Sequence, residues 1–428
     1  MRWTQQQSTA IRQVMKTKEQ PTHTPLHPAR SNMIVLRQLF KLIPRSFINE
    51  AGLSTGAQFK SRTFSVLSHV AAMCFAQLSH AIGLNDVCDT LRLKRKALAG
   101  LGATPPSRNA LSYANKVRSS QCIEQLFWKQ LAHLQYCEPG FASGRKGKGL
   151  LHRFRVKIHA VDSTTMELVA NCMDWAKHRR RKAAAKMHLR FNLHSFLPSC
   201  AIVDTAKHHD NLRAREICAG LEDGEIVIFD KAYVDFGHLE DLDARGVWWV
   251  TRAKDNMCYE VAEDLPVSQG GNIVKDEVIL LEGEQVVRRV EAWVEVDGKQ
   301  KLMVFITNNF EWSPKSVCDL YRRRWDIEVF FKQVKQTLRL SNFLGHSANA
   351  VRWQVYTALL VYVLLRFQAY MSQWTHSFTR LFAVVRSTLW ERMDLPKLLL
   401  SYGTAGAQFK VWGAPDQAWL PGLAPKLS

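Results

Sequence analysis

The distribution of apolar residues in the middle of the chain predicts two β-strands that each lead to an aspartate. Apolar residues alternate with longer polar ones over residues 155–161, which is the period of a strand with one buried face. Residues 225–229 are apolar after the first position, as in a strand that is buried on both faces. Asp162 follows the first strand and Asp230 follows the second. We therefore expect both carboxylates at an edge of one sheet.

Further elements fit between and after these strands. Residues 187–193 and 200–204 have strand patterns, and residues 211–221 have helical spacing with Asn211 as the expected N-cap. Residues 236–242 have helical spacing as well. This mixture of strands and helices predicts an α/β core.

The segment from residue 255 to residue 301 has a different pattern. Apolar and polar residues alternate through most of it, and the dipeptides Gly270-Gly271 and Asp297-Gly298 are turn signals. The chain between Asp230 and the next predicted helix is longer than one helix and one strand require. We expect a mostly β insertion in the α/β core.

The first third of the chain has helical patterns instead. Apolar residues at helical spacing predict three helices, over residues 36–43, 64–78 and 84–93. Pro44 should end the first of them. Ser107 follows two prolines and is expected to cap a helix that begins at Arg108.

A charged helix is predicted late in the chain, over residues 313–340. Tyr321, Arg324, Glu328 and Lys335 fall within about one sixth of its circumference at 100° per residue. A solvated stripe of charge would have the same pattern. A carboxylate between two cations also suits a site where a metal binds the carboxylate and the cations hold phosphate oxygens. Two strand-end aspartates and this glutamate are the oxygen ligands that hard divalent cations prefer.

These residues resemble those of a known family. The four helical residues match the YREK signature of the IS4 family of bacterial insertion-sequence transposases. Asp162 in Ala-Val-Asp-Ser-Thr-Thr and Asp230 in Phe-Asp-Lys-Ala-Tyr match the first two catalytic aspartates of that family. The resemblance covers about residues 36–367. It departs from the family at Lys231 and Ala232, where arginine and glycine are common, and it leaves the triad intact.

The resemblance implies a ribonuclease-H-like catalytic core with a β-rich insertion, preceded by a helical N-terminal domain. It implies a DDE transposase that binds the terminal inverted repeats of an insertion sequence, cleaves the DNA at its ends and joins the 3′-hydroxyls to target DNA. A homodimer is expected, because two ends must be synapsed. Two alternatives remain: a nuclease of the same fold without strand transfer, and a domesticated DNA-binding protein.

The sequence patterns and the resemblance together predict seven segments. They are a flexible tail (1–33), a helical DNA-binding domain (34–138), a basic linker (139–152), the first part of the catalytic core (153–254), the β insertion (255–301), the second part of the core (302–392) and a C-terminal tail (393–428).

The ligand set predicts phosphoryl transfer assisted by metal ions. Asp162, Asp230 and Glu328 would hold a pair of Mg²⁺ ions, for which Mn²⁺ could substitute. One ion would lower the pKa of the attacking water or 3′-hydroxyl, and the other would stabilise the leaving oxygen. Two nearby cations, Arg324 and Lys335, would neutralise phosphate oxygens. Tyr321, Arg324 and Lys335 are thus predicted DNA contacts.

Other DNA contacts are predicted outside this helix. Arg108 and Asn109 suit base edges in a major groove, although a solvated helix face is equally consistent. Lys186 follows the dense basic run 177–182 and is expected to hold DNA beside the active site. Trp293 is a candidate to receive a flipped base, as an aromatic residue in the β insertion does in relatives, but strand tryptophans more often belong to a core.

Composition agrees with a cytoplasmic, nucleoid-associated enzyme. The 58 Lys and Arg residues against 38 Asp and Glu give a net charge of +20, which favours a polyanionic partner such as double-stranded DNA. The nine cysteines are scattered singly, as is typical of reduced thiols. The most apolar stretch, residues 355–365, is shorter than the roughly 20 residues that span a bilayer. It predicts a buried helix and no membrane partner.

Overall fold

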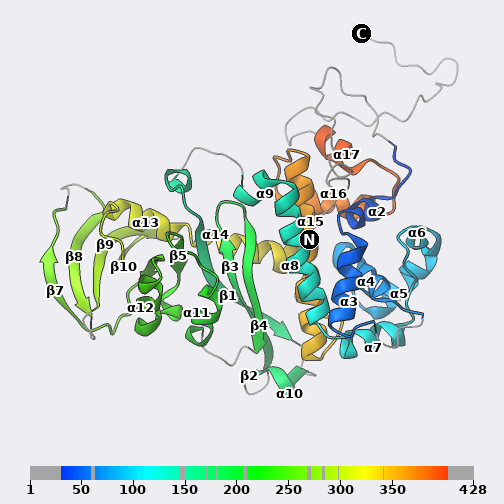
Figure 1. Ribbon diagram of the computed structural model, residues 1–428, viewed down its shortest axis with the longest axis horizontal. Helices are drawn as coiled ribbons and strands as arrows, with labels where there is room; N and C mark the ends of the chain where they lie inside the picture. The colour runs from blue at the N-terminus through cyan, green and yellow to red at the C-terminus, as the bar shows by residue number, and fades with distance from the viewer. Residues whose placement is uncertain are drawn as a thin grey trace, which may run out of the picture. The chain divides into compact units, whose positions relative to one another are not determined.

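The computed structural model describes residues 30–58, 63–144, 150–168, 172–179, 182–205, 210–267, 271–281, 285–296, 298–340 and 342–402. These residues form two compact units (Figure 1). One unit consists of residues 138–355, and the other joins the chain up to Cys137 with the chain from Tyr356 onward. The helices after residue 355, which were predicted as part of the catalytic core, therefore belong with the N-terminal helices.

The unit of residues 138–355 is built on one sheet. Its strands are β1 (Ile158–Leu168), β2 (Lys177–Arg179), β3 (Lys182–Asn192), β4 (Leu197–Thr205), β5 (Ile226–Phe229), β6 (Trp248–Arg252), β7 (Tyr259–Asp264), β8 (Ile273–Leu281), β9 (Val286–Val296) and β10 (Lys299–Thr307). Its helical segments are α9 (Pro139–Ser143), η1 (Leu150–Arg153), α10 (Met173–Ala176), α11 (Asn211–Cys218), η3 (Lys231–Tyr233), α12 (Phe236–Ala244), α13 (Pro314–Arg322), α14 (Trp325–Lys332) and the π-helical η4 (Gln333–Thr337).

Parallel and antiparallel strands meet at β1. It pairs parallel with β5 from Ile158 to Val161, and β5 pairs parallel with β6. On its other side β1 pairs antiparallel with β3, and β4 pairs antiparallel with β3 (Figure 1). The predicted end of the first strand at Val161 was wrong. Because β3 accompanies β1 as far as Leu168, the strand continues past the point where β5 stops.

The predicted β insertion is present, and it continues the sheet of the core. Strands β7, β8, β9 and β10 pair in sequence, and β10 returns to pair antiparallel with β6, Phe305 opposite Arg252. A buried ion pair joins β8 to β9, in which both oxygens of Asp276 accept hydrogen bonds from Arg288. Arg288 also donates to the carbonyl of Phe310, just before α13 begins. This guanidinium therefore ties the insertion to the start of α13.

The charged helix predicted over residues 313–340 is interrupted. It consists of α13, α14 and η4, with a tight turn between the first two, where the amide of Arg324 donates to Tyr321 O, three residues back. The predicted N-cap of α11 was also wrong. Asp210 precedes that helix, and its side chain makes no capping bond because it binds other partners.

The other unit is helical in its described part. Its helices are α2 (Val35–Lys41), α3 (Arg45–Ser54), α4 (Val66–Ser79), α5 (Leu84–Leu93), α6 (Arg95–Ala99), α7 (Arg108–Val117), α8 (Gln121–Cys137), the later part of α15 (Ala348–Met371), α16 (Phe378–Thr388) and α17 (Leu395–Ser401). The predicted break at Pro44 and the predicted cap at Ser107 are confirmed, since the Ser107 hydroxyl accepts from Ala110 N at 3.2 Å. The expected C-terminal tail begins with a helix, α17.

The apolar stretch predicted over residues 355–365 is the middle of a longer helix. α15 has 24 residues and, among the described helices, is alone in being long and apolar enough by itself to cross a membrane. In the most apolar 18 residues of this helix, 83% are buried inside the protein, which is the pattern of a core helix. α4 and α5 are long and apolar enough to cross a membrane only when they are taken together, and this pair is bent by 105°.

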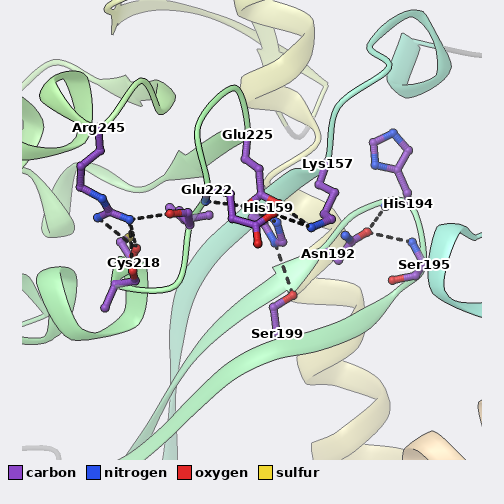
Figure 2. A network of polar contacts seen from close by, with 12 residues as sticks. Lys157, His159, Asn192, His194, Ser195, Ser199, Cys218, Glu222, Glu225 and Arg245 are labelled. Carbon is purple, nitrogen blue, oxygen red and sulfur yellow. Dashed lines mark hydrogen bonds and ion pairs between the residues drawn. The ribbon is translucent and has the colours of Figure 1, made fainter. Parts of the chain in front are cut away.

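A buried carboxylate organises the start of β1 and β5 (Figure 2). Glu225 lies 2.8 Å from Lys157 Nζ and 3.4 Å from His159 Nε2, and it accepts from Glu222 N at 3.2 Å. Burial alone would raise the pKa of Glu225, but these hydrogen bonds outweigh it and lower the pKa to about 2. The ionised carboxylate thus stabilises the ends of both strands.

We predict that Glu225→Gln lowers the free energy of unfolding by about 1–3 kcal/mol at pH 7, because the buried network loses its negative charge and one of its two acceptor oxygens. Since the pKa is depressed by folding, this loss should shrink as the pH falls from about 4.5 towards 2. Denaturant unfolding at several pH values measures it. Glu222→Gln, at a side chain that is 76% exposed, is the control and should change the stability by less than about 0.5 kcal/mol. Equal effects of the two variants would contradict the assignment.

Candidate active site

The pairing of β1 with β5 brings the two predicted aspartates together. The last pair in the register is Val161 opposite Phe229, so Asp162 and Asp230 are the next residues of adjacent parallel strands. Side chains alternate between the faces of a sheet, and both aspartates therefore lie on the same face. The Asp162 carboxylate accepts from Ser163 N at 2.8 Å. That of Asp230 accepts from Ala232 N at 3.2 Å and so begins η3.

Helix α14 adds the third carboxylate. α14 packs against β1 and β3, with the ring of Phe330 centred 4.7 Å from that of Phe191. Arg324, just before α14, donates to Asp162 and lies 3.5 Å from Glu328 Oε1. The guanidinium thus connects the strand aspartate with the helical glutamate, and it is buried whereas Glu328 remains 46% exposed.

Tyr321 completes this arrangement from α13. Its hydroxyl donates to Asp230 Oδ2 at 3.3 Å, and its ring lies beneath the guanidinium of Arg324, 5.8 Å from ring centre to Cζ. Burial raises the pKa of Tyr321 to about 12, so the phenol stays protonated as a donor. Three residues of the predicted signature, Tyr321, Arg324 and Glu328, are therefore gathered around the two aspartates.

Burial dominates the electrostatics of Asp162. Burial raises the pKa of Asp162 to about 7, Arg324 opposes this shift, and the nearby charges of Glu328 and Asp230 add to it. A bound cation would relieve this repulsion. The chemistry of three carboxylates fits a hard divalent cation such as Mg²⁺. Across the described residues, however, no three His, Cys, Asp or Glu side chains are spaced as a ready metal site, and it is Arg324 that lies among the carboxylates here.

Lys335, the fourth residue of the signature, is on η4. Burial lowers the pKa of its ammonium, and the charges of Glu328 and Glu167 oppose this shift. Lys335 therefore lies close enough to Glu328 and Glu167 to feel their charges.

Lys186, a predicted DNA contact, lies on β3 and binds a carboxylate. Its ammonium donates to Asp210 Oδ1 at 2.9 Å, and the same oxygen accepts from the Ser163 hydroxyl. Ser163 and Asp162 point to opposite faces of β1. Lys186 therefore belongs to the layer behind Asp162. The side chains of the basic run 177–182 lie outside the described residues.

The candidate contacts of the helical unit are on the surface of α7. Arg108 and Asn109 are exposed in its first turn. Asn115 on the same helix is buried and hydrogen-bonds His69 at 2.7 Å, so it faces the core. The exposed first turn remains the candidate surface for DNA.

A pocket that sequence reasoning missed lies next to Tyr321 and Arg324. Its volume is about 240 Å³, and the half-exposed ring of Trp325 is part of its lining. Trp293 is also half-exposed, on β9, but it is not among the lining residues. The sequence feature that could have indicated this pocket is Trp325, a large aromatic residue directly after Arg324 and within the signature.

Comparison with protein families gives two matches. Residues 156–364 match the transposase DDE domain, and this range contains the three carboxylates, Tyr321, Arg324 and Lys335. Residues 31–104 match a domain of unknown function, DUF4372, and cover the helical region from α2 to α6.

Several transposases are similar to the chain. A protein named as a transposase, y4zB of Sinorhizobium fredii, is 29% identical over 60% of this chain and 73% of its own length. The probable transposase of insertion sequence IS5377 of Geobacillus stearothermophilus is 29% identical over 50% and 57%. Transposase InsG of IS4 from Escherichia coli is 25% identical over 43% of each chain. The chain thus spans less than two thirds of the second and third relatives.

One solved structure was also found to be similar. It is a piggyBac transposase synaptic complex with hairpin DNA, with a TM-score of 0.44 and 8% identity over 89% of this chain and 85% of that one.

We predict that Arg324→Gln lowers the free energy of unfolding by about 3 kcal/mol, because it leaves Asp162 buried without its cation. The loss should be largest above pH 7 and smaller at pH 5, where Asp162 can take up a proton. Arg322→Gln, at a side chain that is 64% exposed, is the control and should stay within about 0.5 kcal/mol of the wild type. Thermal unfolding of both variants at the two pH values measures these losses. Equal losses of stability in the two variants would refute the role of Arg324.

Proposed function

Because the chain belongs to the DDE transposases of IS4-type insertion sequences, we propose that it cuts and pastes such an element. It would bind the terminal inverted repeats, cleave the DNA at both ends and join the 3′-hydroxyls to target DNA. The observation that carries the proposal is the meeting of Asp162, Asp230 and Glu328 around Arg324 and Tyr321, inside the matched domain.

The order of the core strands supports a ribonuclease-H-like fold for this catalytic part. Three antiparallel strands, β4, β3 and β1, continue through β1 into the parallel strands β5 and β6. α11 lies between β4 and β5 along the chain, and α12 lies between β5 and β6. This order places one aspartate on the first strand and the second after the first parallel neighbour.

In this proposal the carboxylates bind metal ions and the cations neutralise phosphate charge. A pair of Mg²⁺ ions held by Asp162, Asp230 and Glu328 would activate the attacking oxygen and stabilise the leaving oxygen. Arg324 and Lys335 lie beside the carboxylates and would hold phosphate oxygens of the scissile strand. Tyr321, protonated and buried, holds Asp230 in place from α13.

Binding to the element ends would use the helical unit. The exposed first turn of α7, with Arg108 and Asn109, would read bases, and the net charge of +20 would draw the protein to DNA. A homodimer would synapse the two ends. The expected site of action is the cytoplasm, where the element's DNA lies.

A nuclease of the same fold is the second candidate, because it would use the same carboxylates. Its cleavage would show no preference for the element ends and no strand transfer. End-specific binding without cleavage would instead indicate a domesticated DNA-binding protein.

We predict that Asp230→Asn lowers end cleavage by about 10³-fold or more while end binding is kept, because a ligand of the reacting centre is lost. Excision of the element in a bacterial host and Mg²⁺-dependent cleavage of end DNA by the purified protein measure this. Glu240→Gln, at an exposed carboxylate of α12, is the control and should cleave as the wild type does. Cleavage by Asp230→Asn at the wild-type rate would contradict the assignment of Asp230 as a catalytic residue.

We also predict that Arg108→Ala weakens binding to the terminal repeat by about 1–3 kcal/mol and reduces discrimination against unrelated DNA, because a base contact is lost. Lys96→Ala, at an exposed lysine of α6, should weaken binding to both DNAs equally or leave it unchanged. Fluorescence anisotropy at fixed salt compares the two sequences. Unchanged discrimination in Arg108→Ala would exclude α7 from base reading.

A further inference from the structure

A polar cluster lies directly behind Asp162, on the opposite face of β1 and β3. Its centre is Asp210, whose Oδ1 accepts from the Ser163 hydroxyl at 3.1 Å and from Lys186 Nζ at 2.9 Å. Ser163 is the neighbour of Asp162 in the chain and pairs with His188 across the two strands. Asp210 therefore binds β1 at the residue that follows Asp162 in the chain.

The same cluster reaches the turn that begins at Asp230. Nδ1 of His188 lies 3.0 Å from the hydroxyl of Tyr233 and 3.6 Å from Asp210 Oδ1. The rings of His188 and Tyr233 meet edge to face, with their centres 6.1 Å apart. Tyr233 is the last residue of η3, the turn whose first amide bonds are made by Asp230 itself.

The burial of this cluster indicates that it does more than fill the core. His188 is completely buried and Tyr233 is 1% exposed, in a layer where the neighbours Val161 and Phe229 are apolar. Burial lowers the pKa of His188, so the ring is neutral. Polar groups in such a layer cost free energy unless they find partners. Nδ1 of His188 finds Tyr233 and Asp210, whereas its Nε2 has no hydrogen-bond partner among the described residues, so the contacts of Nδ1 set the position of the ring.

We infer that Asp210, His188 and Tyr233 are positioning residues that fix the separation between Asp162 and Asp230. Asp210 accepts a hydrogen bond from Ser163, next to the first aspartate, and His188 contacts the hydroxyl of Tyr233, in the turn after the second aspartate. Groups that orient metal ligands in this way set the affinity for the metal. The inference rests on the proposed function, since it takes the two aspartates as ligands of a divalent cation.

The test compares Tyr233→Phe with the wild type. Removing the hydroxyl should raise the half-saturating Mg²⁺ concentration for end cleavage by about 10-fold, while the rate at saturating metal returns close to that of the wild type. Mn²⁺ binding to the same proteins, measured by titration calorimetry, should weaken by a similar factor. Asp210→Asn is the second variant and should shift both quantities in the same direction, should Tyr233→Phe fold poorly.

The matched control is Tyr356→Phe. Tyr356 is also a buried tyrosine, and its hydroxyl donates to Glu124 at 2.7 Å in the helical unit. Removing this hydroxyl leaves Glu124 without its donor, far along the chain from the aspartates. It should leave the half-saturating Mg²⁺ concentration unchanged. A lower maximal rate in Tyr233→Phe with unchanged metal dependence would overturn the inference and leave a role in stability only. A wild type that binds no Mn²⁺ and cleaves no ends would overturn the inference together with the proposed function.

Discussion

The parallel pairing of β1 with β5 is the constraint on which the site depends. Only four residues of each strand pair, and the register ends at Val161 and Phe229, one residue before the two aspartates. A shift of the register by one residue would turn one carboxylate to the opposite face of the sheet. The buried Glu225 network secures the start of both strands, and the Asp210 cluster contacts the chain just beyond Asp162 and Asp230. The short strand pair is thus held from both ends.

The second determinant is the position of one cation among three carboxylates. Arg324 is held by the tight turn between α13 and α14, and α13 is in turn fixed through Arg288 to the β insertion. Tyr321 also contacts this part of the sheet directly, since its ring is centred 5.0 Å from that of Phe305 on β10.

Much of this could be predicted from the sequence, because local patterns decide it. The apolar run before Asp230 predicted a buried strand, and the cap at Ser107 predicted the start of α7. The spacing of Tyr321, Arg324 and Glu328 predicted a common face, and the three do gather although the helix is interrupted. What failed depended on partners far along the chain. β1 extends beyond Asp162 because β3 pairs with it. The bond of Lys186 to Asp210 could not be predicted either, because it joins residues 24 positions apart. The pairing of His188 with Ser163 depends on the register of β3 against β1, which the sequence pattern does not give.

The most direct test of the central claim is crystallography of the protein with Mn²⁺ and cleaved-end DNA, using the anomalous signal of the metal to locate it. The account predicts an anomalous peak bounded by the carboxylates of Asp162, Asp230 and Glu328, with Arg324 moved from Asp162 to a phosphate oxygen. A peak elsewhere, or a complex in which these three carboxylates bind no metal while the DNA end is engaged, would contradict it.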